Sequence, residues 1–182
     1  MSEILAAVYR GDQARVDELL AEGTELDVFE AAAVGRTGRV EELLDAEPGL
    51  VSAWAEDGFT PLHLAAFFRH PATARLLVDR GALVDVVALN EQLQVTPLQS
   101  AAAARQEETA ALLLERGADP NVRQRGGFTA LHAAAQHGDE PLAELLLSHG
   151  ADPALAADDG RTAADFARDG GHTELAARLA TG

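Results

Sequence analysis

Apolar positions along the chain fall into pairs of short helical patterns separated by turns. The first pattern of a pair is rich in alanine, as at 64–66 and 133–135, and the second carries a stripe of leucines, as at 112–114 and 142–147. Apolar residues at this spacing predict amphipathic helices. Neither helix of a pair can bury its apolar face alone, so we expect the pairs to stack around a common core. Helix-stopping glycines follow the leucine-rich patterns at Gly81, Gly117 and Gly150.

The same segment recurs along the chain at a nearly constant interval. Threonines that precede the alanine-rich helices lie at 60, 96, 129 and 162, which gives spacings of 36, 33 and 33 residues. Each threonine is a candidate N-cap, and Pro61 and Pro97 occupy the first helical position after two of them. A period of this length indicates a repeat architecture built from helix-turn-helix units.

The repeated segment resembles the ankyrin-repeat family. The resemblance rests on the Thr-Pro-Leu-His motif at 60–63 and on the Gly-Ala-Asp-Pro-Asn ending at 117–121, and it covers nearly the whole chain. It implies an all-α solenoid of about six helix-turn-helix repeats, joined by β-hairpin-like fingers in a right-handed stack with a concave inner face. It also implies that His63 and His132 form hydrogen bonds within the hairpin and the helix start.

We expect a single domain over residues 1–182. Its first and last repeats serve as caps, and repeats one and two lack the Thr-Pro-Leu-His motif. Gly23 leads into the next helix too soon for a full hairpin. The repeat boundaries that the markers indicate are 1–23, 24–56, 57–91, 92–125, 126–158 and 159–182.

Composition narrows the possible functions. The absence of cysteine excludes disulfides, cysteine zinc sites and thiol catalysis. The formal net charge is −16, and the 14 basic residues are all arginine, so we expect no nucleic-acid partner. The N-terminus lacks a basic region and no apolar run approaches about 18 residues, which predicts a soluble cytoplasmic protein without membrane contact. We further expect a monomer, and the lysine-free, alanine-rich composition suggests a bacterial source with a GC-rich genome.

Residues that could carry catalysis are scattered. His70, His137, His149 and His172 fall in different repeats, with no pair at i, i+4. No serine lies in a Gly-x-Ser-x-Gly context, and no glycine cluster matches a phosphate-binding loop. A solenoid of this type also lacks the enclosed pocket that excludes water during catalysis. We therefore expect no enzyme activity, no catalytic residues, no metal and no cofactor.

One hairpin departs from the repeat period. Gly81 lies 15 positions before Thr96, whereas the corresponding segment that ends at Thr129 spans 12. The three extra residues fall in an apolar stretch that contains Leu89 and Leu93. Insertions in solenoids map to loops, often on the binding face. Alternatively, these apolar side chains pack on neighbouring hairpins.

Aromatic residues gather in the third repeat, as Trp54, Phe59, Phe67 and Phe68. The resemblance implies that these positions form the hairpin tip and the exposed side of the first helix, where partner contacts vary. Exposed aromatic side chains are costly unless covered, and aromatic residues dominate the energetics of interfaces. The alternative is that Phe67 or Phe68 packs into the seam between repeats.

Charged residues separate by helix type. Acidic residues concentrate on the leucine-rich helices, where they form a solvated face. Arginines at the ends of the alanine-rich helices complement the negative helix end, or they form a positive ladder suited to an acidic partner segment. At 69 and 105 the ankyrin-repeat family usually has glycine instead. These arginines are Arg10, Arg36, Arg69, Arg105 and Arg168.

These patterns favour a protein-protein interaction module that binds a partner protein on its concave surface of fingers and inner helices. The alternative is an acidic inhibitor or immunity-type protein that occludes a basic enzyme surface. The candidate partner-binding residues are Trp54, Glu56, Phe59, Phe67, Phe68, Leu89, Leu93, Arg105, Arg123, Arg125, Phe128, Gln136 and His137.

Overall fold

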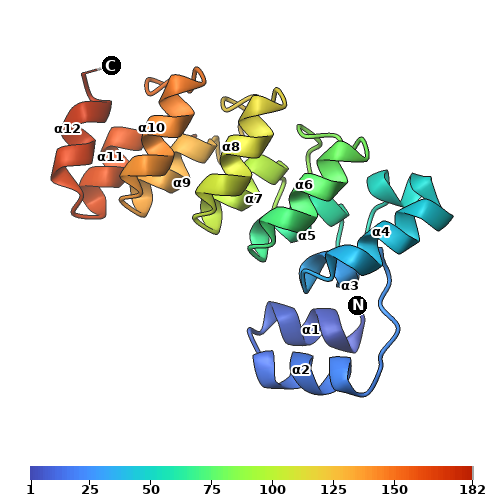
Figure 1. The fold of residues 1–182 in the computed structure, drawn as a ribbon. Helices are drawn as coiled ribbons and strands as arrows, with labels where there is room; N and C mark the ends of the chain where they lie inside the picture. The colour runs from blue at the N-terminus through green and yellow to red at the C-terminus, as the bar shows by residue number, and fades with distance from the viewer. Residues whose placement is uncertain (182) are drawn as a thin grey trace.

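The computed structural model describes residues 1–181 and folds them into six consecutive helix pairs (Figure 1). A short 3-10 helix, η1 (Pro48–Ser52), follows the second pair. The first helices of the pairs are α1 (Glu3–Tyr9), α3 (Val28–Ala33), α5 (Pro61–Phe67), α7 (Pro97–Ala103), α9 (Ala130–Gln136) and α11 (Ala163–Asp169). The second helices are α2 (Gln13–Ala21), α4 (Thr37–Ala46), α6 (Pro71–Asp79), α8 (Glu107–Glu115), α10 (Glu140–Ser148) and α12 (Thr173–Leu179). This confirms the predicted all-α solenoid.

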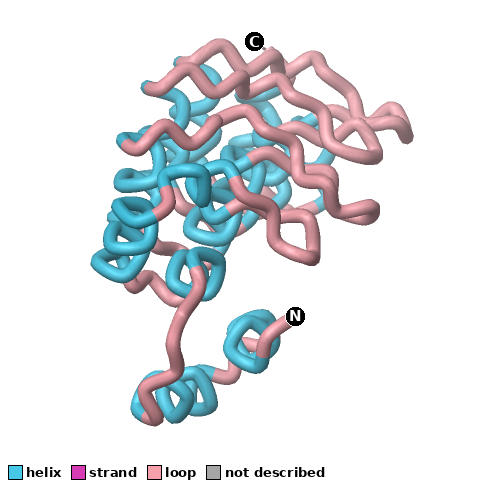
Figure 2. The backbone as a smooth tube through the Cα atoms, turned by 90° about the vertical axis from the view of Figure 1, so that its right-hand side faces the viewer, coloured by secondary structure: helices cyan, strands magenta, loops and turns pink. Residues whose placement is uncertain are grey.

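The pairs lie side by side along an arc (Figure 1). From α3 to α11 each first helix packs against the next first helix, and the second helices from α4 to α10 form a parallel row. From the second pair onwards, the loops between pairs, which we call fingers, project from one side of the stack (Figure 2). We call the surface of first helices and fingers the inner face. Each pair contacts its immediate neighbours, and the core runs continuously along the array.

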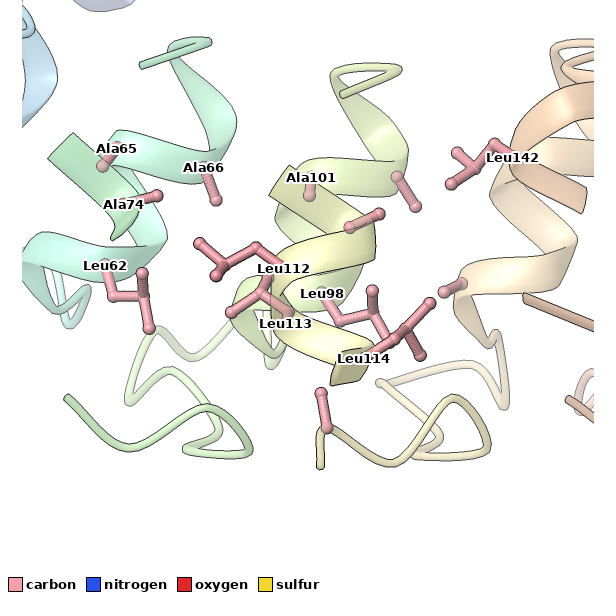
Figure 3. Packing of buried hydrophobic residues seen from close by; sticks show 14 of the residues in the cluster. Leu62, Ala65, Ala66, Ala74, Leu98, Ala101, Leu112, Leu113, Leu114 and Leu142 are labelled. Carbon is pink, nitrogen blue, oxygen red and sulfur yellow. The ribbon is translucent and has the colours of Figure 1, made fainter. Parts of the chain in front are cut away.

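Leucines and alanines fill the core between the pairs (Figure 3). Leu62 and Leu98 are fully buried on the first helices, and Leu113 is fully buried on a second helix. Ala66 and Ala101 are also completely buried. Because the side chain of alanine is a single methyl group, neighbouring first helices can pack closely without voids. The alanine-rich pattern of the sequence therefore follows from the stacking geometry.

The predicted threonines begin the first helices. The Thr60 backbone N–H donates to His63 Nδ1 at 3.3 Å, and the His63 backbone N–H donates to the Thr60 hydroxyl oxygen at 3.5 Å. This reciprocal pair is a capping box, and it recurs at Thr96, Thr129 and Thr162. The capping boxes satisfy backbone N–H groups that a helix start leaves without partners.

The third residue of a first helix also ties that helix to the next finger. His63 Nε2 lies 3.0 Å from the Val95 carbonyl oxygen. In the following pair, Gln99 Nε2 donates to the Val122 carbonyl at 2.7 Å. The hydrogen-bonding role that the resemblance implied for His63 is therefore confirmed. His132 keeps the capping role, but its Nε2 has no hydrogen-bond partner among the described residues.

Single turns close the fingers, and within residues 1–181 no finger forms a strand ladder. The Gln124 N–H donates to the Phe128 carbonyl across one finger at 2.8 Å. In the finger with the insertion, the Ala88 N–H reaches the Val95 carbonyl instead, so this turn encloses three more residues. No finger separates α2 from α3, as Gly23 predicted.

The chain leaves each of the six first helices through a residue with positive φ. Glycine fills this position at Gly11, Gly35, Gly138 and Gly171. The equivalent positions after α5 and α7 hold Arg69 with φ 70° and Arg105 with φ 56°. A residue with a Cβ atom is strained in this region by about 1–2 kcal/mol. Two neighbouring repeats therefore carry backbone strain that the others avoid.

We expect Arg69→Gly to raise the free energy of unfolding by about 0.5–1 kcal/mol, because relief of the left-handed strain outweighs the greater flexibility of unfolded glycine. Urea denaturation would measure the change. Gly11→Ala is the matched control, since a Cβ atom there would meet nothing within 4 Å and adds only the backbone strain. A destabilised Arg69→Gly protein would show that the arginine side chain holds the fold together.

We also expect acid to destabilise the protein through His63. Burial lowers the pKa of this ring from 6.5 to about 4. Between these pH values the unfolded chain binds more protons than the folded one, so stability is present above pH 6.5 and falls as pH drops towards 4. Protonation would also remove the acceptor that caps Thr60.

His63→Gln isolates this effect, because Gln99 already occupies the equivalent position in the next repeat with the same capping box. Between pH 6.5 and 4, the free energy of unfolding should fall in both proteins, but by up to about 3 kcal/mol less in the variant than in wild type. Chemical denaturation at several pH values would measure both proteins. An identical pH dependence in the two proteins would exclude His63 as the titrating group.

Candidate functional site

A pocket opens on the inner face at the middle of the array. At the fourth position after the capping threonine, α5, α7 and α9 carry Leu64, Ser100 and Ala133, and at the seventh position α5 and α7 carry Phe67 and Ala103. The small residues of α7 and α9 leave a hollow beside the bulky residues of α5. This central pocket has a volume of about 380 Å³. Its lining residues are Tyr9, Phe59, His63, Leu64, Phe67, Leu93, Val95, Gln99, Ser100, Ala103, Gln124, Thr129 and Ala133.

Tyr9 brings the first helix pair to the wall of the central pocket. Its hydroxyl donates to the Asp57 carboxylate at 2.7 Å, and its ring meets the Phe68 ring edge-on with centroids 5.3 Å apart. Phe68 in turn packs edge-on against Phe67 at 5.2 Å. Burial and the hydrogen bond to Asp57 raise the pKa of Tyr9, so the phenol stays protonated at neutral pH. The contacts fix this wall in position.

The inserted finger supplies Leu93 to the lining of the pocket. Asn90 braces the finger, because its side-chain oxygen accepts from the Leu93 N–H at 2.9 Å and its amide donates to the Asp57 carbonyl at 2.9 Å. The neighbouring Leu89 N–H donates to the Gly58 carbonyl at 2.8 Å. The insertion is therefore tied to the preceding finger, and it holds an apolar side chain over the pocket.

The central pocket is uncharged. Helices α5, α7 and α9 contain no aspartate, glutamate or arginine. Three polar side chains of the wall already have hydrogen-bond partners, with His63 on Val95, Gln99 on Val122 and Thr129 on His132. Because the His63 pKa is about 4, its ring is neutral at physiological pH. The surface that a ligand could contact is mainly apolar. Its most exposed side chains are Phe67, at 45% accessible, and Leu93, at 56%.

Three of the residues predicted for partner contact line the central pocket: Phe59, Phe67 and Leu93. The expectation that Phe59 is exposed is wrong, because only 8% of it is accessible and it belongs to the core. Its ring packs 5.9 Å from the His63 ring, which holds it at the back of the pocket. Phe68 is half-buried against Tyr9, as the alternative of packing between repeats expected.

The other predicted residues surround the pocket or lie beyond it. Trp54 and Glu56 border a separate hollow next to the N-terminus. Phe128 is half-buried and packs on Phe166, with ring centroids 5.3 Å apart. Arg105 and Arg123 pair with Asp139 and Asp158. The remaining four are exposed and do not line the pocket: Leu89, Arg125, Gln136 and His137.

Sequence reasoning missed the small residues of the pocket and Tyr9. Ser100 and Ala103 occupy the same register as Leu64 and Phe67, so comparing the repeats position by position would have revealed the hollow. Tyr9 had no such signal, because its contact with Asp57 spans 48 residues and depends on how the first pair packs.

We compared the central pocket with the other hollows of the described chain and searched the same residues for metal clusters and membrane-spanning helices. Two hollows have larger volumes, about 650 Å³ between the loops at 23–26 and 35–39 and about 450 Å³ between the first two pairs, but polar atoms make up half or more of their linings. Within residues 1–181, no cluster of three or more histidine or acidic residues could hold a metal ion. In the same residues, no helix has the length and apolar character needed to cross a membrane.

Comparison with known protein families agrees with the helix pairs. Residues 4–124 match a family model described as ankyrin repeats (3 copies), and residues 113–167 match one described as ankyrin repeats (many copies). Ankyrin repeats are in general non-catalytic modules for protein-protein interaction. The matches span nearly all of the helix pairs, including the capping threonines and the inserted finger, and the chain therefore belongs to the ankyrin-repeat family.

Proposed function

We propose that the chain binds a partner protein through its inner face, with the central pocket as the main contact. The observation that carries this proposal is the gathering of exposed apolar side chains around a hollow that no part of the described chain fills. Covering apolar surface yields about 25 cal/mol per Å², so a partner side chain seated here gains binding energy. Contacts at the centre of an interface typically dominate its affinity.

The walls of the pocket are held in place before a partner arrives. Tyr9 is fixed by Asp57, and Leu93 is fixed through Asn90. A binding surface that is already ordered loses less conformational freedom on association, so more of the contact energy appears as affinity. Around this centre we propose a rim of exposed predicted residues, namely Trp54, Leu89, Arg123, Arg125, Gln136 and His137. In this role the chain acts in the cytoplasm as a monomer without catalysis.

A second candidate function rests on charge. The second helices carry 12 of the 30 acidic residues of a chain with net charge −16, for example Glu41, Glu42, Glu107 and Glu108. Such a surface suits an inhibitor that occludes a basic enzyme. Attraction of this kind weakens steeply with salt, whereas apolar binding in the central pocket does not.

We expect Leu93→Asp and Ala103→Arg to abolish capture of the native partner, because one places a charge on the pocket rim and the other fills the hollow. Both positions are exposed, so the fold should tolerate the changes. Leu83→Asp is the control, since Leu83 lies in the same finger, is 65% exposed and does not line the pocket. Affinity capture from cells of the source organism, quantified by mass spectrometry, would compare the four baits.

The informative result is the pattern across the baits. A protein retained by wild type and Leu83→Asp but lost from both pocket variants supports binding at the pocket. A protein retained by the pocket variants would place the interaction elsewhere. If that protein is also released by moderate salt, the acidic second helices are the binding surface.

A further inference from the structure

We propose, on the basis of the proposed function, that the inner face recognises an acidic segment of a protein, in which one bulky apolar residue fills the central pocket and neighbouring carboxylates bind Arg69 and Arg105. The two arginines lie two residues beyond Phe67 and Ala103, which line the pocket. Helices α5 and α7 pack directly against each other. The arginines therefore form a cationic edge along one side of an uncharged apolar hollow.

Arg69 differs from three arginines on or directly after the second helices. Arg80, Arg116 and Arg178 each bind a carboxylate on the second helix of the preceding pair. Within residues 1–181, Arg69 has neither an ion pair nor a side-chain hydrogen bond, and Arg105 contacts one carboxylate at 3.3 Å. The three arginines of the second helices thus join neighbouring repeats, whereas Arg69 keeps its guanidinium donors available. Guanidinium groups are well suited to bind carboxylates through paired hydrogen bonds.

Interaction with the helix dipole does not explain why the arginines stand at these positions. After α1, Arg10 follows the last helical residue, and Gly11 takes the left-handed position. A cation therefore sits at that helix end without strain. Arg69 and Arg105 occupy the left-handed position itself, at a cost in stability. Strain that persists in two adjacent repeats beside a pocket is typical of a binding site.

The charge of the surrounding surface determines whether an acidic or a basic segment binds at the central pocket. A chain with net charge −16 repels acidic segments over most of its surface, and the acidic second helices repel them most. At the central pocket an acidic segment meets the neutral helices α5, α7 and α9 and the cationic edge. A basic segment would instead be drawn towards the second helices. Charge complementarity therefore favours acidic residues next to the apolar anchor.

Selection of random peptides displayed on phage, with the full chain as target, tests this inference. We expect the selected peptides to share a large apolar residue flanked by Asp or Glu. Fluorescence anisotropy with a synthetic copy would give the Kd. The Arg69→Gly, Arg105→Gly double variant should bind about tenfold more weakly, while its thermal unfolding midpoint rises. Replacing the acidic residues of the peptide by their amides should weaken binding to wild type in the same way.

Matched variants separate the failure of this inference from failure of the proposed function. Arg75→Gln is the control, because Arg75 is exposed on α6 outside the pocket, and it should leave the Kd unchanged. Loss of peptide binding in Ala103→Arg, together with an unchanged Kd in the double glycine variant, would keep the pocket and overturn the role of the arginines. A basic consensus among the peptides would also overturn it.

Two further results would contradict the assignment. Peptides that bind Ala103→Arg as well as wild type would show that the central pocket is not the binding site, which removes the proposed function itself. Self-association of the wild-type chain in sedimentation experiments, abolished by Leu93→Asp, would make a second copy the occupant instead of an acidic segment.

Discussion

A hydrogen bond from the start of one first helix to the next finger sets the geometry of the inner face. His63 spans from the cap of its own helix to the Val95 carbonyl, and Gln99 repeats the arrangement one pair later. Because these bonds join consecutive repeats, the two fingers that accept them are held at a fixed distance from the first helix that precedes each of them. The hollow at the centre of the array depends on that spacing. The stacking of leucines and alanines stabilises the array, and the capping side chains fix where its fingers lie.

The sequence was sufficient to predict everything that one repeat determines by itself. The capping threonines, the glycine stops and the three-residue insertion all follow from local chemistry and from comparing repeats, and the structure confirms them. Features that need several repeats in place were harder to predict. Phe59 was expected at the surface because its finger is exposed, but contact with His63 and the core buries it. The place of Tyr9 depends on the packing of the whole first pair, to which no local signal corresponds.

Stability and recognition place opposite demands on the ends of α5 and α7. Glycine adopts the left-handed conformation without strain, and four of the equivalent helix ends have a glycine. Arginine at the other two helix ends carries backbone strain, but it places a cation beside apolar surface. In a repeat protein this exchange is local, because each unit contributes its own stability and a contact with its neighbours. The remaining pairs can therefore support two strained helix ends without loss of the fold.

The position of Tyr9 joins the wall of the central pocket to the first helix pair. No finger connects that pair to the next one, and α1 packs less extensively on α3 than the later first helices pack on one another, so this pair opens locally more readily. When α1 detaches, Tyr9 leaves Asp57, and the pocket loses one side. Affinity for a ligand in the pocket therefore includes the free energy of docking the first pair. Ligand binding and the docking of the first helix pair are thermodynamically linked. An occupied pocket therefore protects the backbone amides of α1 from exchange with solvent.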